Sequence, residues 1–327
     1  MRAVVCRAYG PPESLVVQEV PAPRPGPGEV VVAVRAAAVN FPDVLIAADR
    51  YQVTMPLPFV PGSELSGRIV ETGPGTTELS PGERVYASLP TGAFAERAVV
   101  PAASLTRIPG GMSFAQAAAA GVTYRTAHHA LRSIARVRRG QWVLVLGAAG
   151  GVGSAAVDLA RHFGARVVAA ASGPEKLALC RARGAEHALD YTQPGLKTRI
   201  KECTEGGADI VLDPVGGPYA EQALRGMRRG GTFVTLGYAA GDIPTIPLNL
   251  VLLKGVAIRG LEVRTFAQDA PEESRRDMAE LHALLAQGRI APHIGARYPL
   301  ERAAEALRLV ADRSALGKVV LDVSEDD

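Results

Sequence analysis

A glycine-rich turn directly after an apolar strand restricts the fold of this chain more than any other feature. The apolar run Trp142–Leu146 predicts a buried strand, and the sequence Gly-Ala-Ala-Gly-Gly-Val-Gly follows it at residues 147–153, where a helix is predicted to begin. Glycines at such a turn let the backbone approach a pyrophosphate, whose charge the helix N-terminus then binds. The pattern predicts a dinucleotide site, with a turn used only for packing as the alternative. The residues expected in that site are Ala148, Gly150, Gly151, Val152 and Gly153, with Ala148 in the place of the first glycine.

Around this turn, segments with the hydrophobic pattern of strands alternate with segments with the hydrophobic pattern of helices. Further apolar strands are predicted at 166–170, 208–212 and 232–236, and amphipathic helices separate them. Strands that alternate with helices form parallel sheets through right-handed crossovers. Residues from 141 to about 263 therefore predict an α/β fold with a doubly wound parallel sheet.

The first third of the chain has a different character. Short strands near 30–34, 66–71 and 84–87 are separated by dense Pro and Gly, which indicates a small, partly open barrel. After the α/β region, helices near 273–286 and 301–311 and a strand at 318–323 most simply return to complete this first domain. With 327 residues the chain is long enough for two domains. We expect residues 1–122 and 263–327 in a substrate domain and 123–262 in a cofactor domain.

Composition excludes several classes of function. There are 36 Lys and Arg against 33 Asp and Glu, too balanced for a nucleic-acid-binding surface. No apolar run is long enough to insert in a membrane, and the N-terminal residues read as a strand and not as a secretion signal. The three cysteines are odd in number and far apart, so no disulfide framework is expected. A cytoplasmic protein fits these observations best.

The end of the second strand of the α/β region bears on the choice of dinucleotide. NAD-specific sites place a carboxylate there, about 20 residues after the glycines, to bind the ribose 2′-OH. Here Ser172 and Lys176 occupy that region. A hydroxyl and an ammonium suit a 2′-phosphate, so NADPH is the expected cofactor. The alternative for Lys176 is an ordinary solvated side chain in the first turn of a helix.

Several segments give the chain a resemblance to a known family. They are residues 36–43 (AAAVNFPD), 59–67 (FVPGSELSG), 120–127 (AGVTYRTA) and 315–321 (ALGKVVL), together with the glycine turn. With them the chain resembles the zinc-independent quinone oxidoreductase (zeta-crystallin-like) branch of the medium-chain dehydrogenase/reductase superfamily. The resemblance implies a Rossmann cofactor domain, a GroES-like β-rich substrate domain and a homodimer.

The resemblance also exposes departures from the zinc-dependent members. Their catalytic metal ligands correspond here to Asn40, Ser63 and Ala119, which cannot build a tetrahedral zinc site. The cysteine-rich structural zinc lobe is also missing. No metal site is predicted, and the six histidines, scattered without ligand spacing, are expected to be structural or exposed.

The same resemblance implies roles for individual residues. Asn40 and Tyr51 are expected to bind substrate or cofactor, with Tyr51 able to return a proton and Asp43 orienting its neighbours. Thr123 is expected at the nicotinamide carboxamide. Other expected cofactor contacts are Tyr191, Leu236, Gly237, Leu261, Val263 and Arg313.

Three functions remain open from the sequence. The first is hydride transfer from NADPH to a quinone, which needs no metal because the acceptor is electron-poor. The second is an NADPH-dependent ene-reductase acting on an enone or enoyl thioester, for which Arg50 and Arg264 are available as cations. The third is a non-catalytic protein that binds NADPH.

Overall fold

The computed structural model describes residues 1–324 and divides into two compact units. Unit 1 comprises Met1–Val122 and the chain from Pro292 onwards, and unit 2 comprises Thr123–Ala291. Among the described residues no helix is both long and apolar enough to cross a membrane.

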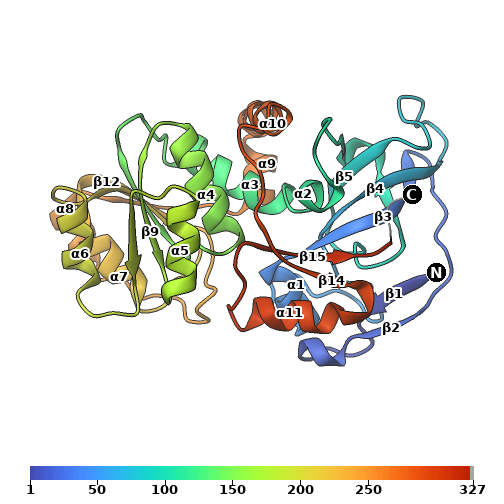
Figure 1. Ribbon diagram of the computed structural model, residues 1–327, viewed down its shortest axis with the longest axis horizontal. Helices are drawn as coiled ribbons and strands as arrows, with labels where there is room; N and C mark the ends of the chain where they lie inside the picture. The colour runs from blue at the N-terminus through green and yellow to red at the C-terminus, as the bar shows by residue number, and fades with distance from the viewer. Residues whose placement is uncertain (325–327) are drawn as a thin grey trace. The chain divides into compact units, whose positions relative to one another are not determined.

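Unit 2 is built on a six-stranded parallel sheet with the order β10-β9-β8-β11-β12-β13 (Figure 1). Its strands are β8 (Trp142–Leu146), β9 (Arg166–Ala171), β10 (His187–Asp190), β11 (Ala208–Asp213), β12 (Met227–Thr235) and β13 (Ala257–Gly260). The chain starts at the centre of the sheet, winds outward to one edge, then returns and winds to the other edge. This is the doubly wound Rossmann topology that the alternating pattern predicts.

Helices cover both faces of this sheet. Figure 1 shows α4 (Gly151–His162) and α5 (Pro174–Ala182) on one side, and α6 (Leu196–Cys203) and α7 (Tyr219–Arg225) on the other. The remaining helices of the unit are α3 (Gly121–His129, which begins in unit 1), a π-helical turn Ala130–Ile134, α8 (Leu248–Lys254), α9 (Val263–Asp269) and α10 (Pro271–Ala286). Every side chain of β8 is buried, because a parallel sheet covered on both faces leaves its central strand no contact with water.

Unit 1 is the β-rich, GroES-like unit. A seven-stranded sheet has the order β14-β15-β3-β4-β5-β7, and β6 pairs with β3. Its strands are β3 (Glu29–Val39), β4 (Glu64–Thr72), β5 (Arg84–Ser88), β6 (Arg97–Pro101), β7 (Leu105–Arg107), β14 (Ile294–Pro299) and β15 (Lys318–Asp322), while β1 (Arg2–Val5) and β2 (Val16–Glu19) form a separate hairpin-like pair. The antiparallel pairing of β15 with β3 places the last strand against the first third of the chain.

Short helices complete unit 1. They are α1 (Phe41–Ala47), α2 (Phe114–Ala118) and α11 (Ala303–Ala311), with single 3-10 turns at Pro12–Ser14, Ala102–Ser104 and Leu300–Arg302. Leu307 of α11 and Leu321 of β15 are fully buried in the same core as Val32 of β3. The C-terminal segment thus supplies part of the core of the first unit.

Two sequence predictions differ from the structure in their boundaries. The return to the first unit lies at residue 292 and not at 263, because α10 is tied to the π-helical turn of unit 2 by Arg132, whose guanidinium donates to Glu280 at 2.9 and 3.0 Å. Strand β3 ends at Val39 and not at 34, because its last residues pair with β4 and β15.

Candidate functional site

The glycine turn of unit 2 has the form required to bind an anion. Helix α4 starts with Gly150 at its N-cap, without a side-chain cap and without an acidic residue in its first turn. A Cβ atom on Gly153 would lie 2.1 Å from the carbonyl oxygen of Gly147. Only glycine at position 153 therefore lets the turn and the helix pack this closely. The N–H groups at the start of this twelve-residue helix remain available to a pyrophosphate.

The end of β9 bears the groups expected for a 2′-phosphate. The Lys176 ammonium donates a hydrogen bond to the Ser172 hydroxyl at 3.2 Å. Tyr191, directly after β10, donates its backbone N–H to the carbonyl oxygen of Ala171 and stacks on Tyr219 with ring centroids 4.2 Å apart. Ser172, Lys176 and Tyr191 therefore follow neighbouring strand ends, β9 and β10, at one edge of the sheet.

The remaining expected cofactor segments follow the next strand ends of the same sheet. Leu236 comes after β12 and donates its N–H to the carbonyl oxygen of Asp213, and Gly237 follows it. Leu261 comes after β13 and donates to the carbonyl oxygen of Thr235, and Val263 opens α9. The carboxyl ends of parallel strands are where dinucleotides bind, and these backbone hydrogen bonds keep the segments together there.

Asp213 is a residue of this edge that the sequence analysis missed. Its Oδ1 accepts hydrogen bonds from the N–H groups of Val215 and Gly216, both at 2.8 Å, while Oδ2 has no hydrogen-bond partner within residues 1–324. Burial raises the pKa of this carboxyl. A carboxylate directly after the apolar run Ile210–Leu212 was the available signal.

Two further expected cofactor residues differ in setting. Thr123 is buried in the first turns of α3. Arg313 is exposed in unit 1, in the turn between α11 and β15, where it has a left-handed backbone with φ of 58°. Arg313 is therefore a surface arginine of unit 1, whereas the strand-end segments belong to unit 2.

Unit 1 contains a buried polar cluster around Asn40, formed with Glu64 and Lys318. The Asn40 side-chain N–H group donates to Glu64 Oε2 at 2.8 Å and to Ser63 Oγ at 3.2 Å. The Lys318 ammonium donates to Asn40 Oδ1 at 2.7 Å and to Glu64 Oε2 at 2.9 Å. Asn40, Glu64 and Lys318 are at most 6% exposed, so the opposite charges are paired away from water.

The start of α3 completes this cluster. Glu64 Oε1 accepts the backbone N–H of Val122 at 2.5 Å. A Cβ atom at Gly121 would lie 2.4 Å from Ser88 Oγ and 2.8 Å from Glu64 Oε1, so only glycine lets the carboxylate approach the helix this closely. Both oxygens of Glu64 are engaged, one by the helix start and one by Asn40 and Lys318.

Asp43 lies beside the cluster and is 1% exposed. Burial raises the pKa of its carboxyl to about 7, although the Asn40 backbone N–H, which donates to Asp43 Oδ2 at 2.8 Å, and the Ser63 hydroxyl act in the opposite direction. Asp43 therefore titrates near neutrality, as groups that exchange protons at functional sites often do.

Tyr51 lies beyond the C-terminus of α1. It is half-buried and its ring packs against the core of unit 1. The structure thus gives it the apolar contact of a packing residue together with partial exposure to solvent.

The donor set at the position of the family's catalytic zinc does not fit that metal. The fold brings Asn40 and Ser63 together, but an amide and a hydroxyl are weak zinc ligands. The methyl side chain of Ala119 contains no atom that can bind a metal ion. The Lys318 ammonium already supplies a positive charge there, 2.7 Å from Asn40 Oδ1. Glu64 and Lys318 are the residues of this cluster that were not among the site residues expected from the sequence. The sequence feature that could have indicated Lys318 is its charge directly before the apolar run Val319–Leu321.

Comparisons with known proteins agree with this architecture. Residues 26–110 match the alcohol dehydrogenase GroES-like domain family, and residues 151–285 match the zinc-binding dehydrogenase family. The chain is 38% identical over 329 residues to the quinone oxidoreductase-like protein 2 homolog of Nematostella vectensis, covering 99% of this chain and 89% of that protein. It superposes on the Escherichia coli quinone oxidoreductase complexed with NADPH with a TM-score of 0.90 and 26% identity, covering 99% of this chain and 100% of that one.

Segments of much larger proteins are also similar. A mycocerosic acid synthase-like polyketide synthase of Mycobacterium tuberculosis is 34% identical over 304 residues, which cover 91% of this chain and 14% of the synthase. The full-length relative, the match of both domains and the substituted zinc ligands agree with one another. The chain therefore belongs to the zinc-independent quinone oxidoreductase-like branch of the medium-chain dehydrogenase/reductase superfamily and is an oxidoreductase.

Proposed function

We propose that this chain transfers hydride from NADPH to a quinone without a catalytic metal ion. The observation that carries the proposal is the cluster of Asn40, Glu64 and Lys318, which replaces a zinc donor set by an amide held between a carboxylate and an ammonium. Oxidation of an alcohol needs a cation or a strong base at the alcohol oxygen. A quinone is electron-poor and accepts hydride when hydrogen-bond donors meet the developing charge on its oxygen.

The choice of NADPH is supported by the end of β9. Ser172 and Lys176 lie 3.2 Å apart where NAD-specific sites have a carboxylate. The glycine turn at the start of α4 would hold the pyrophosphate, and the E. coli quinone oxidoreductase of the same fold was solved with NADPH. The bound nicotinamide supplies the hydride, while these residues of unit 2 bind and orient the cofactor.

On the acceptor side we assign separate roles to three residues of unit 1. Tyr51 donates a hydrogen bond to the acceptor oxygen. Asn40 acts as a positioning residue, because its amide is already engaged by Glu64, Ser63 and Lys318. Asp43 keeps Asn40 in place, because its Oδ2 accepts the Asn40 backbone N–H at 2.8 Å.

One observation favours a second function. The similar segments of polyketide synthases are consistent with reduction of an α,β-unsaturated thioester, since direct hydride transfer to carbon needs the same cofactor and no metal. An enone or enoyl thioester is therefore the alternative acceptor class.

The test is steady-state oxidation of NADPH and NADH by EDTA-treated protein with quinones, enones and enoyl thioesters. The proposal predicts saturable turnover with quinones and a preference for NADPH. Preference for enones or thioesters would establish the ene-reductase instead. Tight NADPH binding without turnover on any acceptor would identify a cofactor-binding protein and contradict both enzyme proposals.

We also propose that the chain forms a homodimer through the β13 edge of unit 2. All four residues of β13 are exposed, and within residues 1–324 only β12 pairs with this strand. Nearby in sequence, Leu248 and Leu252 of α8 are 79% and 78% exposed, and Leu253 is 64% exposed. An unpaired edge beside exposed leucines is costly in water, and a second copy related by a twofold axis covers both.

The cysteines support a proposal about location. Cys6, Cys180 and Cys203 are all free, and the first two are buried. Unpaired thiols fit a reducing compartment, and we propose the cytoplasm, which cell fractionation followed by immunoblotting would test.

A further inference from the structure

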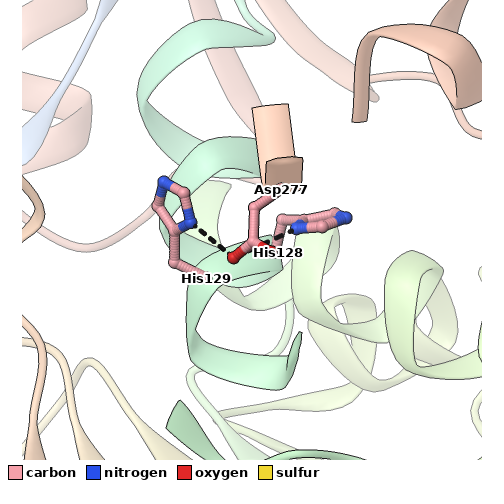
Figure 2. A group of neighbouring side chains, drawn as sticks. All are labelled: His128, His129 and Asp277. Atoms are coloured by element: carbon pink, nitrogen blue, oxygen red, sulfur yellow. Dashed lines mark hydrogen bonds and ion pairs between the residues drawn. The ribbon is translucent and has the colours of Figure 1, made fainter. Parts of the chain in front are cut away.

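A second cluster of ionisable side chains lies within unit 2, away from the glycine turn and the ends of the strands. His128 and His129, the last two residues of α3, face Asp277 of α10 (Figure 2). All three are at most 2% exposed, and a potential ligand atom of each lies within 4.8 Å of those of the others. The two histidines are 148 and 149 residues away from Asp277 in the sequence, so only the fold brings them together.

The distances within the cluster are close to those of a metal site. His129 Nδ1 lies 2.9 Å from Asp277 Oδ2, and His128 Nδ1 lies 4.0 Å from the same oxygen. Ligand atoms bound to Zn²⁺ at 2.0–2.1 Å in a tetrahedron are about 3.3 Å apart. One of these pairs is nearer and the other farther than this value, and all three ligand atoms lie within 4.8 Å of one another, so side-chain adjustments bring them to a common ion.

The bonding of His128 is the observation that points to a ligand. Neither ring nitrogen of this fully buried imidazole makes a hydrogen bond within residues 1–324. A buried polar atom without a partner is costly, and each such atom in a native protein calls for an explanation. Nδ1 points towards Asp277, where an ion held by Asp277 and His129 would become its partner (Figure 2).

The groups around the cluster are those of an outer coordination shell. On the far side of the His128 ring, Nε2 lies 3.3 Å from Glu280 Oε2, which Arg132 holds through two hydrogen bonds. Ser133 Oγ donates to Asp277 Oδ2 at 2.6 Å. Metal-binding histidines usually direct their second nitrogen at a carboxylate in this way, which fixes the tautomer and the orientation of the ring.

We propose that His128, His129 and Asp277 bind one divalent transition-metal ion, Zn²⁺ by its preference for two imidazoles and a carboxylate, as a structural site that joins α3 to α10. The Nδ1 atoms of the two histidines and Oδ2 of Asp277 are the ligands, and a water molecule fills the fourth position. The site has no part in hydride transfer, and its existence does not depend on the identity of the acceptor.

The experiment is a titration of the EDTA-treated, dialysed protein with Co²⁺, monitored by the visible absorption of tetrahedral cobalt and followed by competition with Zn²⁺. We expect one Co²⁺ per chain, displaced by one Zn²⁺, together with a higher melting temperature of the metal-bound protein. Asp277→Asn retains the shape and the hydrogen bonds to Ser133 and His129, and it is expected to weaken binding by about 100-fold.

His162→Gln, a change to a partly buried histidine on α4 outside the cluster, is the matched control and is expected to bind as the wild type does. If Asp277→Asn does not fold, His128→Asn serves as the test variant instead. This variant retains the hydrogen bonds of Asp277 with His129 and Ser133. The absence of saturable cobalt absorption in the wild type would overturn the proposal. So would equal affinity of the folded cluster variant and the His162→Gln control.

Discussion

The ammonium of Lys318 lies 2.9 Å from the carboxylate of Glu64 although 254 residues separate the two in sequence. Their pairing joins the last strand of unit 1 to β4, and both side chains are almost completely buried. Asn40 accepts from Lys318 and donates to Glu64, so its amide is fixed in a single orientation. The charge pair thus fixes the orientation of Asn40 at the end of β3.

This pairing predicts the effect of removing the cation. Lys318→Met leaves Glu64 buried without a counter-charge and is expected to lower the free energy of unfolding by about 3–5 kcal/mol. Urea denaturation measures this change. The double variant Lys318→Met/Glu64→Gln is expected to recover part of the loss, because no charge then remains unpaired. A single-variant loss below about 1 kcal/mol would show that the pair does not stabilise the fold.

Asp43 predicts a pH dependence of stability. Its carboxyl has a pKa of about 7 in the folded protein against an ordinary value of 3.8, so the folded state binds the extra proton between these values. The contribution of the Asp43 carboxyl to the free energy of unfolding is therefore fully present at low pH. It is lost as the pH rises from about 4 to about 7, which lowers the free energy of unfolding by up to about 4 kcal/mol.

Asp43→Asn tests this prediction, because the amide oxygen still accepts from the Asn40 backbone N–H. The difference in unfolding free energy between variant and wild type, measured from pH 4 to pH 8, is expected to shift in favour of the variant as pH rises. A difference that stays constant across this range would place the pKa of Asp43 outside it.

Substitution of two glycines of the turn by alanine is expected to have different effects on stability and on NADPH binding. A Cβ on Gly153 meets the Gly147 carbonyl oxygen at 2.1 Å and the Ala148 Cα at 2.6 Å, so Gly153→Ala displaces backbone and is expected to destabilise unit 2 by about 1–3 kcal/mol. At Gly150 the nearest atom would be 3.4 Å away. Gly150→Ala is therefore expected to leave the melting temperature nearly unchanged while it weakens NADPH binding, since its methyl group enters the phosphate region. Equal effects of both variants on stability would contradict this distinction.

Lys176 predicts cofactor selectivity. Lys176→Ala removes the ammonium proposed to bind the 2′-phosphate, so the KM for NADPH is expected to rise about 10-fold or more while that for NADH changes little. Initial rates with both cofactors measure this. Arg181→Ala, an exposed change on the same helix α5, is the control. A parallel rise of both KM values would remove the phosphate assignment.

The exposed leucines of α8 predict the oligomeric state. Light scattering of the wild type is expected to give the mass of a dimer, and Leu252→Glu/Leu253→Glu is expected to give a monomer, since two charges would be buried in the interface. Val16→Glu, at an exposed valine of unit 1, is the matched control. A monomeric wild type at micromolar concentration would refute the dimer.

The parts of the fold that the sequence predicts well depend on local patterns. Strand β8 lies at Trp142–Leu146 as expected, and α4 begins within the glycine turn, because an apolar run and a turn of glycines act over a few residues. Strand β3 extends to Val39, well beyond the predicted end at 34, since Ala36–Ala38 have little intrinsic strand preference and are held by pairing with β4 and β15.

The parts that could not be predicted depend on contacts between distant residues. Neither the pairing of Lys318 with Glu64 nor the position of Asp277 beside His128 and His129 leaves a periodic signal in the sequence. The local patterns that identify strands and turns carry no information about which strands pair or in which register. For the same reason, the sequence does not predict that α10 belongs to unit 2.

The proposed reaction is tested most directly by competition between acceptors in one anaerobic mixture. A quinone and an enone at equal concentrations compete for limiting NADPH, and chromatography of the products gives the ratio of the two kcat/KM values. The account predicts that hydroquinone exceeds saturated ketone by at least about 10-fold, with heat-inactivated protein as the blank for uncatalysed reduction. A majority of saturated ketone, or no NADPH consumption above the blank, would contradict it.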